Sequence, residues 1–145
     1  MHTIIGGGIG GLSTALAFEK LNITYQVFER ATEINEVGAG IWLAPNALQV
    51  FDWLGLLEAI KHAGNPINRI QLAKHDFSVL SDNDQSWAEE KYGFATIAIH
   101  RAKLQGILLN ALPKGKVPGH NPHYCSQRSM LYIAFGEFGS YDFIF

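Results

Sequence analysis

Apolar residues in the first thirty positions change their spacing twice, and each change marks a new element. A short apolar run ends at Gly6, which predicts a buried strand over residues 2–5. Between residues 10 and 21 the apolar positions recur every three or four residues, as in an amphipathic helix. Residues 25–28 form a second short apolar run that stops at Glu29. This order predicts a βαβ unit with parallel strands and a right-handed crossover.

The remainder of the chain alternates between helical and strand-like patterns. Helical spacing occurs at residues 47–54, 56–63 and 101–112. Strand-like patterns occur at residues 67–73, 77–80 and 94–99, and a turn is expected at the polar run 81–84. The sequence therefore predicts an α/β fold, a Rossmann-like βαβ dinucleotide-binding domain with a parallel sheet and a small antiparallel excursion.

Composition narrows the class of protein. A chain of 145 residues is one domain's worth, so a single globular unit is expected. Its net charge of −2 lacks the basic excess typical of proteins that bind nucleic acid or an anionic membrane. Its apolar runs are all interrupted before the roughly 18 residues of a membrane span. The single cysteine, Cys125, cannot form an intrachain disulfide, and a cytoplasmic location is expected.

Five glycines occupy six positions between the first strand and the first helix. Gly6, Gly8 and Gly11 have the G-x-G-x-x-G spacing of dinucleotide-binding loops. In such loops the first glycine permits a tight turn, the second lets a pyrophosphate approach the backbone, and the third lets helix and strand pack closely. The helix that follows would stabilise the phosphates with its N-terminal amides and dipole.

Glu29 follows the second predicted strand, where an acidic residue can accept hydrogen bonds from an adenosine ribose. Because a carboxylate there disfavours a 2′-phosphate, FAD or NAD is expected in preference to NADP. A flexible glycine turn without a ligand is the alternative. A dinucleotide-binding loop is favoured over this alternative because the glycines follow a strand, open a helix and precede a strand-end acid within about 30 residues.

Further matches make the resemblance more specific. The loop reads G-x-G-I-G-G-L, Glu29 is followed by Arg30, and G-A-G-I at residues 38–41 precedes P-N-A at 45–47. Later, H-R-x-x-L occurs at residues 100–104. In these motifs the chain resembles the FAD-dependent monooxygenases of the para-hydroxybenzoate hydroxylase type, which include salicylate hydroxylase and kynurenine monooxygenase. The resemblance implies that G-A-G-I forms a second glycine-containing loop and that P-N-A opens a helix after it.

The resemblance implies a set of cofactor contacts and a reaction. The residues expected to contact FAD are Gly6, Gly8, Ile9, Gly10, Gly11, Leu12, Glu29, Arg30, Ala39, Gly40, Ile41, Arg101 and Gln105. Arg101 could otherwise be a solvated residue of a first helical turn. NADH or NADPH would be the electron donor and a small aromatic compound the substrate. The residues that would act in catalysis cannot be assigned from the sequence.

The resemblance covers roughly the first 115 residues. We therefore expect an incomplete FAD-binding domain at residues 1–116 and a C-terminal tail at 117–145 that matches no pattern of the family. His120, His123 and Cys125 in this tail lack a fourth ligand, so no metal site is expected. Its aromatic residues suggest packing against the sheet or against a second copy of the chain.

Three functions are consistent with these observations. The first is the FAD-binding part of an aromatic monooxygenase. The second is a non-catalytic or vestigial FAD-binding module, a truncated member of that family. The third, an unrelated NAD-binding Rossmann protein, is disfavoured because it would not require the G-A-G-I, P-N-A and H-R-x-x-L motifs.

Overall fold

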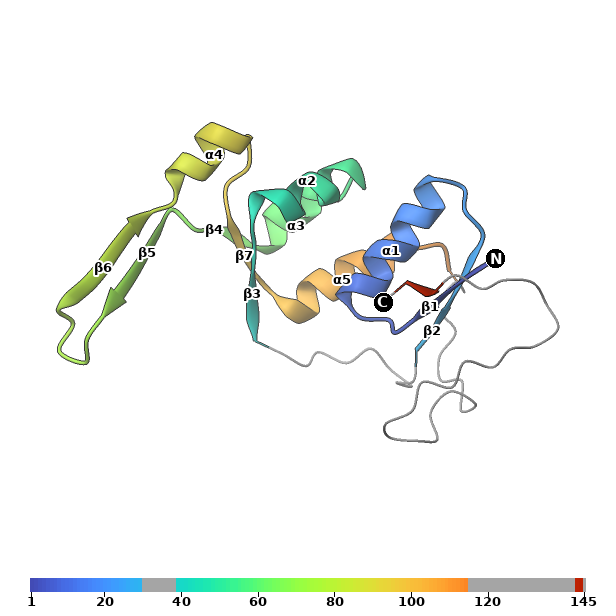
Figure 1. Ribbon diagram of the computed structural model, residues 1–145, viewed down its shortest axis with the longest axis horizontal. Helices are drawn as coiled ribbons and strands as arrows, with labels where there is room; N and C mark the ends of the chain where they lie inside the picture. The colour runs from blue at the N-terminus through green and yellow to red at the C-terminus, as the bar shows by residue number, and fades with distance from the viewer. Residues whose placement is uncertain (30–38, 115–142, 145) are drawn as a thin grey trace. The chain divides into compact units, whose positions relative to one another are not determined.

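Two compact units make up the chain in the computed structural model, which describes residues 1–29, 39–114 and 143–144 (Figure 1). Unit 1 comprises Met1–Asn35 and Leu108–Phe145, and unit 2 comprises Glu36–Ile107. Within the described ranges, no helix is long and apolar enough to cross a membrane.

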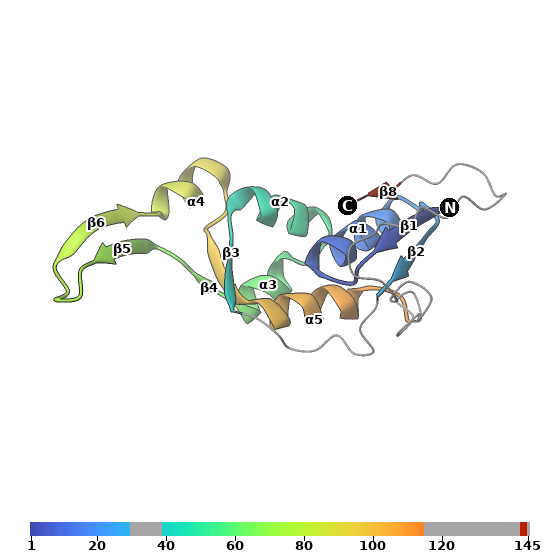
Figure 2. The same cartoon turned by 60° about the horizontal axis from the view of Figure 1, so that its bottom comes forward.

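Unit 1 contains the predicted βαβ arrangement. Strand β1 (His2–Ile5) leads through the glycine loop into helix α1 (Ile9–Lys20), and strand β2 (Tyr25–Phe28) returns parallel to β1. The short strand β8 (Phe143–Ile144) pairs in parallel with the other side of β1, giving the order β2-β1-β8. Figure 2 shows α1 running beside β1 and β2, against which it packs. The α/β prediction is confirmed.

Periodicity determines which side chains α1 buries. Leu12, Ala15 and Leu16 are buried along one side of the helix, together with Ile4 of β1 and Val27 of β2. These spacings of three and four residues place apolar groups on a single helix face. Burial of this apolar surface is the main source of stability for such a layer.

The end of the sheet away from the glycine loop is closed by aromatic side chains. The ring of Phe18 lies between those of His2 and Tyr25, with centroid distances of 5.2 and 6.0 Å. The Tyr25 hydroxyl donates a 2.8 Å hydrogen bond to Glu19. Burial, together with this carboxylate, raises the pKa of Tyr25 well above its usual value.

Unit 2 is built on an antiparallel sheet of order β3-β7-β4. Strand β7 (Ile97–His100) lies in the centre, between β3 (Gly40–Leu43) and the short β4 (Asn65–Pro66). Helix α2 (Pro45–Trp53) contacts this sheet at β3. Helix α3 (Leu57–Ala63) contacts it at β4 and β7. Helix α5 (Arg101–Ala111) follows β7 directly.

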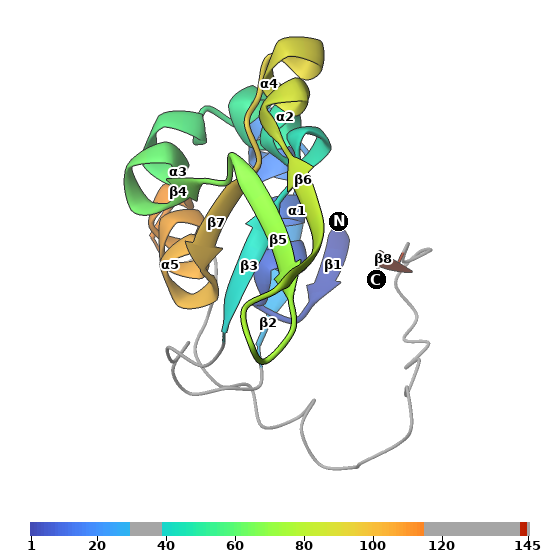
Figure 3. The same cartoon turned by 90° about the vertical axis from the view of Figure 1, so that its left-hand side faces the viewer.

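A two-stranded hairpin and a short helix complete unit 2. The hairpin pairs β5 (Arg69–Ala73) with β6 (Val79–Asp84), and helix α4 (Ser86–Tyr92) follows. Figure 1 and Figure 3 show the hairpin as a separate ribbon that extends away from β3 and β7, and nearly all of its side chains are exposed.

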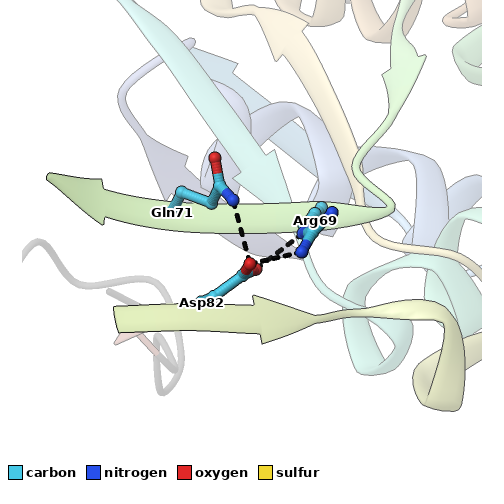
Figure 4. A network of polar contacts seen from close by, with 3 residues as sticks. All are labelled: Arg69, Gln71 and Asp82. Atoms are coloured by element: carbon cyan, nitrogen blue, oxygen red, sulfur yellow. Dashed lines mark hydrogen bonds and ion pairs between the residues drawn. The ribbon is translucent and has the colours of Figure 1, made fainter. Parts of the chain in front are cut away.

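Polar contacts connect the two strands of the hairpin (Figure 4). Asp82 accepts hydrogen bonds from both Arg69 and Gln71, including one of 2.6 Å from the Arg69 Nε and one of 2.9 Å from the Gln71 amide. The Arg69 guanidinium and the Gln71 amide hold the pKa of the Asp82 carboxyl below its usual range. Cross-strand pairs of this kind stabilise a hairpin that has little apolar burial.

The structure differs from the sequence-based expectations in three places. Residues 81–84 continue β6 instead of forming a turn, because Asp82 has partners on the facing strand. The actual turn is stabilised by Asp76, whose carboxylate accepts hydrogen bonds from the Ser78 amide and hydroxyl. Helix α4 was not predicted. Its ends carry recognisable signals, because Asp84 accepts a hydrogen bond from the Ser86 amide at the start and Gly93, with a φ of 76°, ends the helix.

The third difference concerns the G-A-G-I motif. Gly40 and Ile41 belong to strand β3, whereas the sequence indicated a glycine loop. A strand forms because both residues pair with β7, Gly40 opposite His100 and Ile41 opposite Ile99. Such a pairing partner, distant in sequence, leaves no trace in the local pattern.

Gly64 provides a test of packing in unit 2. A Cβ added there would lie 2.5 Å from the Ile97 Cγ2 and 2.8 Å from the Ala98 carbonyl oxygen. We expect Gly64→Ala to lower the free energy of unfolding by about 1–3 kcal/mol, since backbone must move to relieve the overlap. Gly106→Ala in α5 is the control, because a Cβ there meets nothing within 4 Å.

The control should be neutral or raise the free energy of unfolding by about 0.5–1 kcal/mol, the usual gain from alanine inside a helix. Both values can be measured by urea denaturation of the full chain. Equal stability of the two variants would contradict the packing described for Gly64.

Candidate functional site

The turn between β1 and α1 depends on the first glycine of the loop. Gly6 has a φ of 100°, a backbone conformation that residues with a Cβ rarely adopt. Its amide donates a 2.7 Å hydrogen bond to the Phe28 carbonyl of β2. The chain therefore leaves β1 still hydrogen-bonded to its neighbouring strand and turns at once toward α1.

Gly11 brings the helix close to this turn. A Cβ at Gly11 would overlap the carbonyl oxygen of Gly6 and lie 3.4 Å from the Ile4 Cγ2. In contrast, a Cβ at Gly8 or Gly10 would meet nothing within 4 Å. Gly11 is thus needed for packing inside the protein, whereas Gly8 and Gly10 are bordered by open space.

The beginning of α1 offers backbone donors to an anion. Gly8 is the N-cap and makes no side-chain capping bond, and the first turn contains no acidic residue. The Leu12 amide already donates to the Gly8 carbonyl, at 2.9 Å, so the donors without a partner inside the helix are the amides of Gly8, Ile9, Gly10 and Gly11. These amides and the helix dipole favour a negatively charged ligand.

Ile9 and Leu12, two predicted FAD contacts in the first turn of α1, differ in the exposure of their side chains. Ile9 is half-buried, in the first turn of α1. Leu12 has no exposed surface, so its side chain belongs to the core. Any contact of Leu12 with a cofactor would have to be made by its backbone.

The carboxylate of Glu29 lies beside the loop. Its Oε2 accepts a 2.5 Å hydrogen bond from the Gly7 amide. This contact connects the end of β2 to the glycine loop, and sequence reasoning missed the part played by Gly7. A Cβ at Gly7 would lie 3.1 Å from the same oxygen, so glycine at this position is the signal that could have indicated the contact. Since a carboxylate has about four acceptor positions, accepting from Gly7 is compatible with accepting from ribose hydroxyls.

A second group of predicted contacts is brought together in unit 2. The Arg101 amide donates a 3.3 Å hydrogen bond to the Ala39 carbonyl, and Gly40 pairs with His100. Residues about sixty positions apart in sequence thus become neighbours where β3 starts and α5 begins. The Arg101 side chain is exposed, and Gln105, half-buried, lies one helical turn further along α5.

Some predicted positions lie outside the described residues. These are Arg30 of the cofactor set and His120, His123 and Cys125 of the tail. Among the residues that are described, no three histidine, cysteine, aspartate or glutamate side chains are grouped so as to hold a metal ion. The group around the glycine loop belongs to unit 1 and the group around Ala39 to unit 2.

Comparison with known proteins gives the relationship of the chain. No protein-family model matches it. It is 37% identical over 98 residues to the FAD-dependent monooxygenase pynG of Aspergillus niger, covering 68% of this chain and 22% of the relative. It is 36% identical over 113 residues to 3-hydroxybenzoate 6-hydroxylase 1 of Aquipseudomonas alcaligenes, covering 77% of this chain and 29% of the relative.

Solved structures agree with these relatives. The fold matches that of Klebsiella pneumoniae HpxO, a structure complexed with FAD and uric acid, with a TM-score of 0.70 and 26% identity. That match covers 80% of this chain and 29% of the HpxO chain. The chain spans between about a fifth and a third of the length of the relatives it matches. The sequence matches and the fold together show that the chain belongs to the family of FAD-dependent aromatic hydroxylases and corresponds to their N-terminal part.

Proposed function

We propose that this chain is the FAD-binding part of a flavoprotein monooxygenase that uses NADH or NADPH and O₂ to hydroxylate a small aromatic substrate. The observation that carries the proposal is the turn from β1 to α1, with open space at Gly8 and the Glu29 carboxylate hydrogen-bonded to Gly7. The relationship to FAD-dependent enzymes supports FAD as the dinucleotide.

The residues of unit 1 fit the adenosine and pyrophosphate of FAD. The open space at Gly8 and Gly10 would admit phosphate oxygens to the backbone, and the amides at the start of α1 would donate to them. Glu29 would accept hydrogen bonds from the ribose hydroxyls of the adenosine. Its negative charge would disfavour a ribose that carries a 2′-phosphate.

In unit 2, the proposed cofactor contacts are Ala39, Gly40, Ile41, Arg101 and Gln105. The guanidinium of Arg101 is suited to neutralise an anionic group through its planar array of donors. Bound FAD would supply the redox chemistry with NAD(P)H and O₂, while the protein would orient it and exclude water.

Finer assignments are also part of this proposal. Residues 1–116 would form the FAD-binding domain, which the tail at 117–145 would follow. The protein would work in the cytoplasm, and its aromatic tail would promote self-association. The second candidate function is a non-catalytic FAD-binding module.

Gly8→Val tests the approach of the pyrophosphate to the backbone. Since a Cβ at Gly8 meets no protein atom and its φ is −75°, the variant should fold normally. The branched side chain should nevertheless occupy the space meant for phosphate and lower FAD affinity at least 100-fold, as measured by equilibrium dialysis. Gly11→Ala is the contrasting variant, because its Cβ overlaps the Gly6 carbonyl and should impair folding itself. Unchanged FAD affinity in folded Gly8→Val would refute this role.

Glu29→Gln tests recognition of the ribose. Glutamine retains an acceptor for the Gly7 amide but loses the negative charge, so the loop should persist. We expect FAD affinity to fall by about 1–3 kcal/mol, the usual effect of losing a hydrogen bond to a charged group. FMN, which has no adenosine, is the control ligand, and calorimetric titration of both ligands provides the measurement. An equal loss for FMN would indicate that the effect is indirect.

Coupling of NAD(P)H oxidation to hydroxylation tests whether the chain alone carries the activity of its relatives. The chain alone should bind FAD but should not couple NAD(P)H oxidation to hydroxylation, since the remaining parts of its relatives have no counterpart among its recognised motifs. The test measures NAD(P)H consumed, peroxide released and hydroxylated product formed with 3-hydroxybenzoate. Product equal to NAD(P)H consumed, with little peroxide, would contradict the expectation and favour a complete enzyme.

A further inference from the structure

The sheet of unit 2 has one covered and one open face. Since side chains alternate along a strand, Leu43, Ile97 and Ile99 lie on one face, and all three are buried. The opposite face carries Gly40, Trp42, Ala98 and His100, which the register pairs as Gly40 with His100 and Trp42 with Ala98. Figure 1 shows β3 and β7 side by side in the same unit.

Trp42 is the most exposed of the three tryptophans of the chain. Its exposed fraction is 63%, whereas Leu43, the next residue, has a fraction of 5%. The neighbours of Trp42 on the open face are small, with Ala98 opposite and Gly40 two residues before it. A Cβ added at Gly40 would meet only the Ile99 carbonyl oxygen, at 3.8 Å. A flat ring could therefore lie beside the indole without displacing other side chains.

The open face is continuous with the proposed cofactor contacts of the same unit. Gly40 is one of these contacts, and it precedes Trp42 by one same-face step of about 7 Å. At the same end of β3, Ala39 accepts the amide hydrogen bond of Arg101. The indole is thus placed one step beyond the point where the backbone is expected to approach the cofactor.

Trp42 differs in kind from those contacts. Backbone approach to a cofactor requires small residues such as Ala39 and Gly40. A tryptophan blocks such an approach but offers a broad aromatic surface for offset stacking with another ring. The exposed His100, on the same face and followed by Arg101, could donate a hydrogen bond to an anionic ring substituent.

We propose that Trp42 is a substrate-specificity residue, against which the ring of a small aromatic carboxylate stacks beside the cofactor. This inference rests on the proposed function, because the open face acquires this role only if Ala39 and Gly40 contact FAD. The inference specifies one residue that contacts the substrate, Trp42, and specifies that the substrate is negatively charged.

The test uses Trp42 as its own reporter. The chain has three tryptophans, so Trp53→Phe with Trp87→Phe leaves Trp42 as the single source of indole fluorescence. The full chain with these two substitutions is titrated with 3-hydroxybenzoate in the presence of FAD, and in parallel with cyclohexanecarboxylate, which has the charge but no aromatic ring. FAD binding is measured separately by equilibrium dialysis.

Saturable quenching of the Trp42 fluorescence by 3-hydroxybenzoate would support the proposal, provided that cyclohexanecarboxylate quenches it at least fivefold less. In the otherwise unchanged chain, Trp42→Ala should then weaken 3-hydroxybenzoate binding about 2- to 10-fold, as expected for the loss of one stacked ring pair. Trp42→Phe should retain most of the affinity. Trp87→Ala, which removes another half-exposed tryptophan of unit 2, should have no effect.

Two results would overturn the inference. If FAD alone quenches Trp42 and 3-hydroxybenzoate adds nothing, the ring beside Trp42 is the flavin. If neither quenches it while dialysis shows bound FAD, no ring stacks there and only the inference fails. Absence of FAD binding in dialysis would instead refute the proposed function, whatever the response of Trp42.

Discussion

The close approach of two glycines, Gly6 and Gly11, is the constraint on which the β1–α1 turn depends. Gly6 adopts a positive φ, and its carbonyl oxygen occupies the place that a Cβ of Gly11 would need. Helix α1 can therefore begin only three residues after β1 ends, and no side chain caps its first amides. A backbone arrangement that leaves helix donors unused is suited to an anionic ligand.

The second element of this arrangement is the carboxylate of Glu29. By accepting a hydrogen bond from the Gly7 amide, this carboxylate fixes the glycine loop to the end of β2 and places a negative charge next to the loop. The same negative charge would repel a phosphate, so the helix end and the carboxylate favour different parts of a dinucleotide. This division is consistent with pyrophosphate at Gly8 and a ribose at Glu29, as we propose.

Much of unit 1 could be predicted from sequence because its contacts are local. The strand, glycine loop, helix and strand follow one another within thirty residues, and the apolar spacing alone separates them. Unit 2 was harder. Gly40 and Ile41 form a strand through pairing with β7, and Asp82 remains in a strand through Arg69 and Gln71. Neither partner is visible in the local pattern. The resemblance implied that Ala39 and Arg101 each contact FAD, but the hydrogen bond between them was not predicted.

We propose above all that the turn before α1 receives the pyrophosphate of FAD. The most direct measurement is a titration of the isotope-labelled chain with FAD, followed through its backbone amide resonances. The amides of residues 6–11 and of Glu29 should shift with FAD, with smaller shifts near Ala39 and Arg101, and FMN should leave the Glu29 amide unchanged. Saturating FAD binding that leaves the amides of residues 6–11 unshifted would contradict it.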